Sequence, residues 1–244
     1  MVYRRFFGEN QPLHIISRAV EERKIFAIND DCLRFIFQIY AANFGRPAFN
    51  LWKKDVVKVA KSLLGGEEVS SKFIKKEHPP LVHIVDFSLV LTHNHFYLVS
   101  AINKGASFFM QKLNTGFAKF FNFKYSRSGA LFGSRYRCIP IETEFQSNAV
   151  SRYVSIVNPL DIFQPGWREN GLKNQEEALK FLENYPFSSF PDKIRKRASK
   201  VIAPQEVLEK YSFFSGMSKD EVIKFVEDFL KQNLSSAGQP FLVE

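Results

Sequence analysis

The order of the hydrophobic segments is the feature that most restricts how this chain can fold. Segments with the apolar pattern of strands occur at 14–20, 81–91, 89–100 and 135–141. Segments with apolar residues at helical spacing occur at 29–44, 106–125 and 143–157. This order of strand, helix, two neighbouring strands, helix, strand and helix matches the split βαβ plan of ferredoxin-like domains, with one helix added. The sequence therefore predicts an α+β fold built on an antiparallel sheet, and the third helix is expected to stop at Asn158–Pro159, because proline disfavours helix just before it.

The stretch 46–80 separates the first helix from the second strand, and we interpret it as an insertion. It contains one short predicted helix, LWKKDVVKVAKSLL, followed by the loop signal GGEEVSSK, and it holds more basic than acidic residues. Two interpretations stay open. The segment is either a solvated, partly ordered excursion or an additional contact for nucleic acid.

The C-terminal part of the chain is polar and predicted to be helical, with helices at 174–185 and 218–232. The final residues, SSAGQPFLVE, are expected to fray. We therefore divide the chain into a domain over 1–160, which includes the insertion, and a helical extension over 161–244.

Two histidines interrupt an otherwise apolar strand in LVLTHNHFYLVS. Side chains alternate along a strand, so His93, His95 and Tyr97 should project from the same face. Neutral imidazole is the commonest metal ligand in proteins, and neighbouring positions on one face can converge on a single ion. The alternative is a pair of histidines satisfied by hydrogen bonds at the surface of a sheet.

The charge of the chain favours a polyanionic partner. Its formal net charge is +9 and its pI is about 9.5. From Phe87 to Ile141 there is no Asp or Glu, and the histidine strand lies inside this stretch. The basic residues within the acid-free stretch are Lys104, Lys112, Lys119, Lys124, Arg127, Arg135 and Arg137. Phosphate groups would meet no carboxylate repulsion from this part of the chain.

Several other classes of protein are disfavoured. No apolar run approaches the ~20 residues that a membrane helix needs, and the N-terminal segment MVYRRFFGENQP lacks the apolar core of a secretory signal. The two cysteines lie far apart in the sequence, which argues against a disulfide framework or a cysteine-rich zinc site. We expect a cytoplasmic protein with no membrane contact.

Five stretches in order resemble the single-tyrosine HUH transposases, and most closely their REP-associated tyrosine transposase branch. They are HIISRAVEERKIF, LTHNHFYLV, FMQKLNTGFAKFFNFKYSRSGALFGSRYR, SRYVSIVNPLD and LKFLENYPFSSFPDKI, and together they cover roughly 13–195. The histidine–hydrophobic–histidine motif of the family falls on His93 and His95, with the polar Asn94 between them where the family has a hydrophobic residue.

The resemblance implies an enzyme that cuts and rejoins single-stranded DNA with a divalent ion, Mg²⁺ or Mn²⁺. His93 and His95 would be metal ligands, and Tyr153 would be the nucleophile that forms a 5′-phosphotyrosine intermediate. The family places an asparagine four residues after the tyrosine, just before a proline, as a further ligand. Here Asn158 follows Tyr153 by five residues, which would turn the two side chains apart on a regular α-helix. Either a π-bulge restores Asn158 to the metal, or water or Tyr97 takes its place.

The expected partner is single-stranded or hairpin DNA, bound by a monomer or a homodimer. The segment GALFGSRYR offers glycines for close backbone approach, arginines for phosphates and aromatic rings for unpaired bases. The residues predicted to contact DNA are Arg18, Lys112, Lys119, Arg127, Phe132, Arg135, Tyr136 and Arg137. Two alternatives remain: a catalytically inactive DNA-binding relative, and an unrelated metal hydrolase or RNA-binding domain on the same architecture.

Overall fold

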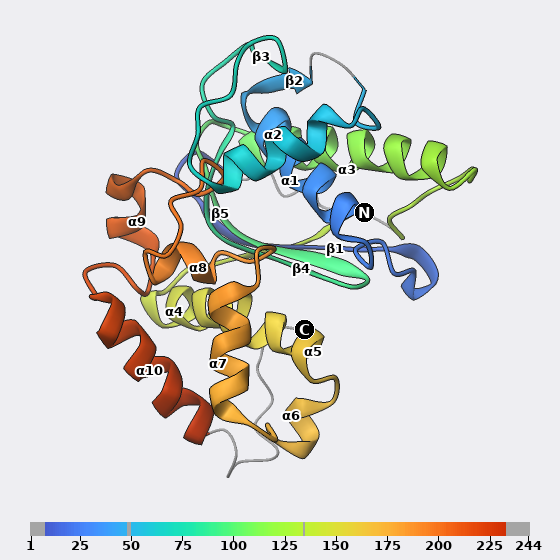
Figure 1. Cartoon of the computed structure of the whole chain (residues 1–244). Coiled ribbons are helices and arrows are strands. Elements are labelled where there is room, and N and C mark those ends of the chain that lie inside the picture. Colours follow the sequence, from blue (N-terminus) through green and yellow to red (C-terminus); the bar gives the residue numbers. More distant parts are fainter. Residues whose placement is uncertain (1–7, 48–49, 134, 233–244) are drawn as a thin grey trace, which may run out of the picture.

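A four-stranded antiparallel sheet forms the centre of the computed structural model, which describes residues 8–47, 50–133 and 135–232 (Figure 1). The strands lie in the order β4 (Val82–Val90), β5 (His93–Ser100), β1 (Pro12–Arg18) and β6 (Arg137–Pro140). Each neighbouring pair is antiparallel. This is the strand order of a split βαβ domain, so the α+β fold predicted from the sequence is confirmed.

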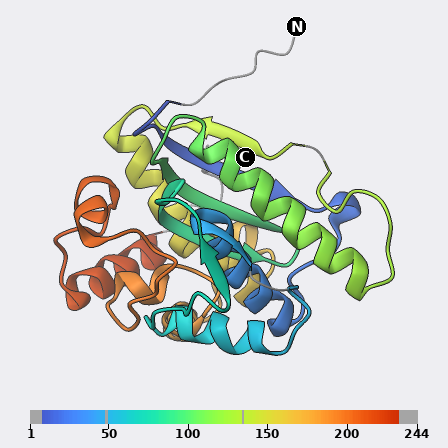
Figure 2. The ribbon, with the colours of Figure 1, turned by 90° about the horizontal axis from the view of Figure 1, so that it is seen from above.

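Two helices, α1 (Asn29–Phe44) and α3 (Gly105–Lys124), cover one face of the sheet. They lie side by side over the strands when the molecule is viewed from above (Figure 2). Their buried phenylalanines pack against apolar side chains of β1, β4 and β5 in a first hydrophobic core. The alternating apolar residues of the strands and the stripes of the two helices account for this layer.

The described residues of the insertion bury apolar side chains in the first core, so the interpretation as a solvated excursion is wrong. It contains α2 (Asp55–Leu64) and a two-stranded ribbon of β2 (Gly45–Pro47) and β3 (Ile74–Lys76). Apolar side chains on one face of α2 are buried against α1. Gly45 lets the ribbon close, because a Cβ at this position would stand 1.9 Å from the carbonyl oxygen of Lys75.

A continuous helical segment crosses the opposite face of the sheet. It begins with α4 (Glu144–Arg152), widens into the π-helix η2 (Tyr153–Val157) and ends with α5 (Asn158–Phe163). The predicted helix end at Asn158–Pro159 is therefore wrong. The wide π turn lies directly before Pro159, and proline is tolerated where a helix resumes because its missing N–H has no partner to lose there.

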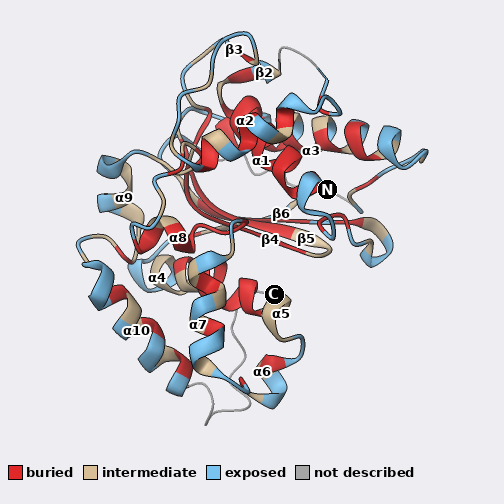
Figure 3. Cartoon of the chain, viewed as in Figure 1, coloured by how far each residue is buried: buried red, intermediate tan, exposed pale blue. Residues whose placement is uncertain are grey.

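The C-terminal extension is helical, as predicted, and shares a second hydrophobic core with this segment. Its helices are α6 (Trp167–Asn170), α7 (Gln175–Asn184), α8 (Phe190–Lys193), α9 (Gln205–Tyr211) and α10 (Lys219–Gln232). Figure 3 shows buried residues on the helix faces that turn towards the sheet and towards one another. The expected fraying of SSAGQPFLVE concerns residues that lie outside the described part of the chain. Within that part, no helix combines the length and the apolar character needed to cross a membrane.

A buried ion pair ties the extension to the sheet and to the helix that leads to Tyr153. Lys193 Nζ lies 3.0 Å from Asp86 Oδ1, and both side chains are buried. The other two partners of the Asp86 carboxylate are hydroxyl donors, Ser151 at 2.7 Å and Ser189 at 2.8 Å. One carboxylate on β4 therefore holds two separate helical segments, α4 through Ser151 and α8 through Ser189 and Lys193.

Candidate active site

The two histidines of the predicted metal motif project from the same face of β5. Their ring centroids are 4.9 Å apart. His93 Nδ1 lies 2.9 Å from the hydroxyl of Thr92, which leaves its Nε2 for another partner. Tyr97 follows on the same face, but its hydroxyl is 2.7 Å from that of Ser147 and is engaged there. The face is the one that the π-helix covers, since Tyr97 and Tyr153 belong to the same core.

A third histidine, which the sequence analysis did not select, belongs to the same cluster. His14 lies on β1, the neighbouring strand, and its Nε2 is 3.0 Å from Nδ1 of His95. A bond to Nδ1 fixes the orientation of the His95 ring and leaves its Nε2 pointing elsewhere, as in the outer contacts of metal-binding histidines. The sequence signal was a polar residue inside an apolar strand, but strand pairing had to be known before His14 could be joined to His95.

All three imidazoles are held in the neutral form that metal binding requires. Burial, together with the charge of Arg137, lowers the pKa of His14 to about 4. Burial, followed by Arg18 and Arg168, lowers the pKa of His93 to about 3. The pKa of His95 lies well below its usual value for the same main reason, since this ring is fully buried.

We expect the metal-free protein to lose stability as the pH falls below about 6.5, the pKa of an unfolded histidine. In this range the histidines bind protons in the unfolded chain but not in the folded chain. The free energy of unfolding therefore falls as the pH drops from 6.5 to about 4, the pKa of His14 in the folded protein. The cost at pH 4.5 should be about 2–3 kcal/mol from His14 alone. Urea unfolding at pH 7 and pH 4.5, in chelator, measures it. His14→Gln should shrink the difference between the two pH values, and an unchanged difference would contradict the assignment.

Tyr153 is the first residue of the π-helix and lies beside the histidines. Its ring centroid is 5.4 Å from that of His95 and 6.0 Å from that of His14. The backbone N–H of Asn158 donates to the carbonyl of Tyr153, five residues back, which is the bond that defines a π turn. Of the two geometries expected for this helix, the structure therefore has the π-bulge.

The π turn places Asn158 on the histidine face of the sheet. Its Nδ2 donates to the hydroxyl of Ser88 over 2.9 Å, and Ser88 is the residue of β4 paired with His95 of β5. Asn158 is fully buried, and its Oδ1 has no hydrogen-bond partner. His95 Nε2 is likewise buried without a partner. A carbonyl oxygen and an imidazole nitrogen left in this way are donors suited to a divalent cation.

The donor set contains histidine and amide groups rather than carboxylates. No group of three His, Cys, Asp or Glu side chains in the described ranges could hold a metal ion. A cation at this place would therefore need Asn158 or water in addition to His93 and His95. These three residues fit such an ion by their chemistry, because each presents a neutral lone pair and two of them carry an otherwise unpaired buried atom.

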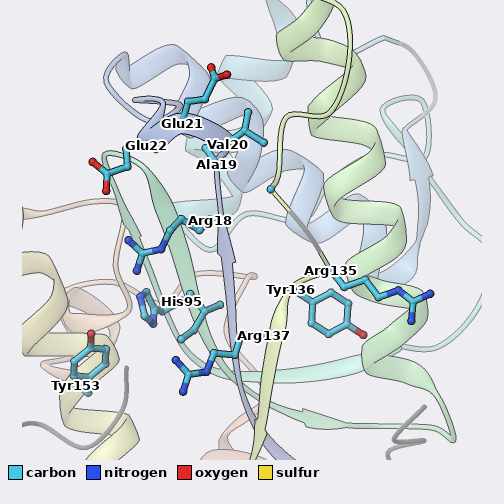
Figure 4. Close-up of a pocket in the computed structure, with 12 residues that line it drawn as sticks. Arg18, Ala19, Val20, Glu21, Glu22, His95, Arg135, Tyr136, Arg137 and Tyr153 are labelled. Atoms are coloured by element: carbon cyan, nitrogen blue, oxygen red, sulfur yellow. The ribbon is translucent and has the colours of Figure 1, made fainter. Parts of the chain in front are cut away.

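A cleft of about 520 Å³ opens beside the histidines. Figure 4 shows Tyr153 and His95 on one side and Tyr136 on the other, with the Arg137 side chain between them, Arg18 above His95 and the Arg135 side chain directed away from the histidine. The rim also carries Glu21 and Glu22 of the short 3₁₀ turn η1 (Val20–Glu22). The structure thus gathers four of the residues predicted to contact DNA around one cavity that also holds the candidate nucleophile.

The remaining four predicted DNA contacts do not line this cleft. Phe132 is half-buried and forms a β-bridge with Ala19 next to it. Lys112 and Lys119 lie on α3, which covers the face of the sheet opposite Tyr153, and Arg127 follows that helix. Lys112 Nζ is 3.2 Å from His78 Nε2 and Arg127 donates to Asn122 over 2.5 Å, so both already have protein partners.

The comparisons with known proteins give one distant likeness. No protein-family model matches the chain, and no curated protein sequence matches it. Among solved structures it is similar to a REP-associated tyrosine transposase bound to a REP hairpin, at 15% identity over 84% of this chain and 92% of the other, with a TM-score of 0.44. A likeness at this score does not establish a common fold, so a function for this chain has to be supported by its own contacts and charges.

Proposed function

We propose that this protein nicks and rejoins single-stranded or hairpin DNA, with Tyr153 as the nucleophile and a divalent metal ion as cofactor. The observation that carries the proposal is the shared cleft. Tyr153 and His95 line the same cavity as Arg18, Arg135 and Arg137. Cations for the phosphate backbone, a hydroxyl nucleophile and neutral imidazoles are the groups that such a reaction needs in one place.

His93, His95 and Asn158 would hold the ion, Mg²⁺ or Mn²⁺. When bound, the ion would polarise the scissile phosphate and offset charge on its oxygens. His14 would hold the His95 ring through Nδ1, 3.0 Å away. The neutral state of the histidines keeps their lone pairs available at physiological pH.

In the proposed reaction, the Tyr153 oxygen attacks phosphorus and the phosphorus–O3′ bond breaks. The products are a 5′-phosphotyrosine and a free 3′-hydroxyl, and the proton lost by the phenol is balanced by the proton gained at O3′. Attack by a 3′-hydroxyl on the phosphotyrosine reverses the step and rejoins DNA. The energy of the phosphodiester is kept in the protein–DNA bond, so no nucleotide cofactor is consumed.

The cleft favours an unpaired strand over a plain duplex. Tyr136 lines its wall next to Arg137, and although the ring also packs on the first core and its hydroxyl lies 3.4 Å from that of Ser107, its exposed part would offer an aromatic surface to a base. Stacking on aromatic rings requires bases that are not paired within a helix. A hairpin offers such bases at its loop and at its single-stranded flanks.

One observation favours a second candidate, a DNA-binding protein without catalysis. Tyr153 is only 2% exposed and packs in the second core, although it borders the cleft. A nucleophile must reach phosphorus, and a side chain so covered must have its hydroxyl at the cavity wall to do so. The two candidates share the binding surface and differ in whether a covalent bond forms.

A covalent-adduct assay separates them. The full chain is incubated with end-labelled hairpin DNA carrying single-stranded flanks, with Mn²⁺ or with EDTA, and run on a denaturing gel. We expect a protein–DNA adduct with Mn²⁺ only, and its loss in His95→Gln. Binding without an adduct in any metal would replace the enzyme by the inactive relative, and stronger binding to RNA would contradict both.

Affinity for hairpin DNA should fall steeply with salt, because cations that neutralise phosphates release counterions. The expected slope of log affinity against log salt is about −0.7 for each phosphate neutralised on a single strand. Arg137→Gln should reduce that slope by about one contact. Fluorescence anisotropy at salt concentrations from about 50 to about 300 mM measures this slope. Lys119→Gln on the opposite face is the matched control and should leave the slope unchanged.

A further inference from the structure

We propose that Arg168, held by Asp161, is a positioning residue that orients the Tyr153 hydroxyl for attack and offsets charge on its oxygen. This inference rests on the proposed function and deepens it. Arg168 belongs to the C-terminal extension, outside the motif segment that contains Tyr153. The extension would therefore supply part of the catalytic geometry as well as part of the core.

The orientation of Arg168 is set by a paired carboxylate. Its Nε lies 3.1 Å from Asp161 Oδ1 and its second terminal nitrogen lies 2.5 Å from Oδ2. The indole N–H of Trp167 donates to the same Oδ1 over 3.0 Å. Two parallel bonds from guanidinium to carboxylate fix the plane of the group, which a lysine could not reproduce.

The fixed guanidinium lies against Tyr153. Its central carbon is 5.2 Å from the centroid of the tyrosine ring. The Tyr153 side chain is also one of the groups that raise the pKa of Arg168. Because a guanidinium only donates hydrogen bonds, it could act on the phenol oxygen only as a donor to that oxygen. The ring that carries the proposed attacking atom is thus contacted by a cation whose own position is determined by Asp161.

The charge of Arg168 also reaches the candidate metal ligands. It is one of the charges that depress the pKa values of both His93 and His95. Burial would lower the pKa of Arg168 itself, but Asp161 and Tyr153 raise it above its usual range, so the group stays charged. It cannot take the phenol proton, and its role is limited to orientation and charge.

A purely structural arginine would give a different set of contacts, and the chain offers one as a control. Arg152 lies directly before Tyr153, with its guanidinium carbon 5.2 Å from the ring centroid of Phe213. The ring distance matches that of Arg168, but phenylalanine has no hydroxyl to orient. Comparing the two arginines therefore separates packing on a ring from action on an oxygen.

The test measures the rate of adduct formation at saturating hairpin DNA with Mn²⁺. Arg168→Gly should slow the rate by about 10²-fold, the usual cost of one preorganised donor, with less change in the dissociation constant for the hairpin. Added methylguanidinium should restore part of the rate in Arg168→Gly. Arg168→Lys, which keeps the charge but loses the fork, should remain slow. Arg152→Gly should form adduct at the wild-type rate.

The outcomes distinguish the two proposals. If the wild type forms no adduct in any metal, the proposed function falls and this inference falls with it. If the wild type forms adduct and correctly folded Arg168→Lys reacts at the same rate, only the inference is overturned. Should Arg168→Gly fail to fold, by circular dichroism, Arg168→Lys and Asp161→Asn decide. Slowing in both supports the inference, whereas wild-type rates in both overturn it.

Discussion

Tyr153→Phe should abolish covalent attachment to DNA while hairpin binding and the fold persist. The substitution removes one hydroxyl and keeps the ring, which contacts His95, His14 and Arg168. Losing the nucleophile of a covalent mechanism typically costs a factor of about 10⁴ or more in rate. Loss of the hydroxyl should cost only about 1 kcal/mol of stability, the usual worth of one hydrogen bond. The denaturing-gel assay and anisotropy measure the two effects separately.

The matched control for this variant is Tyr97→Phe. Tyr97 belongs to the same core and projects from the same face of the sheet, but its hydroxyl is bonded to Ser147. This variant should still form adduct. Persistence of the adduct in Tyr153→Phe would mean that another residue attacks, and the helix that begins with Tyr153 would then have only a structural role.

Lys193→Met should destabilise the protein by about 3–5 kcal/mol, the usual cost of leaving a buried charge without its partner. The lysine Nζ is bonded to Asp86, to the carbonyl of Val85 and to the hydroxyl of Ser212. Burial already raises the pKa of the Asp86 carboxyl, even with the lysine beside it. Without the lysine, Asp86 would have to bind a proton for the chain to fold. Urea unfolding at pH 7 measures the loss.

The double variant Asp86→Asn with Lys193→Met should recover most of that loss, because no unpaired charge remains. Lys196→Met, an exposed position in the same segment, should change stability by no more than about 0.5 kcal/mol. A large effect at Lys196 or none at Lys193 would contradict a specific role for the buried pair. Because Ser151 also donates to Asp86 two residues before Tyr153, Lys193→Met should slow adduct formation as well.

The architecture could be predicted from the sequence because each strand and helix of the sheet layer has its own spacing of apolar residues. Alternation in LVHIVDFSLVL and the stripe of phenylalanines in FFMQKLNTGFAKFF depend only on neighbours along the chain. Local signals also placed His93 and His95 on one face. Local patterns could not predict contacts between distant segments. His14 joins the cluster through strand pairing, and Arg168 contacts Tyr153 from the extension.

Two local signals were overridden by tertiary contacts. The polar character of the insertion suggested solvation, yet the apolar face of α2 packs on α1. Pro159 suggested a helix end, yet the helix continues beyond it. The π turn lies just before the proline, where the missing N–H of Pro159 has no hydrogen-bond partner to lose. Propensity describes an isolated segment, and the free energy of packing against a core is larger. The roles of Tyr153, His93, His95 and Asn158 stay predictions, for the assays above to decide.

The π turn has a consequence for how related chains are found. A residue added to an α-helix rotates everything beyond it by about 100°, whereas here the extra position is taken up within a single turn, and both flanking helices keep their faces. The number of residues between two positions on either side of this turn therefore does not give the angle between their side chains around the helix axis. A search pattern that demands an interval of four residues between tyrosine and asparagine would miss Tyr153 and select Val154, whose side chain has no nucleophilic group. A search that compares the angular positions of the two side chains around the helix axis, rather than their separation in residues, would find such chains.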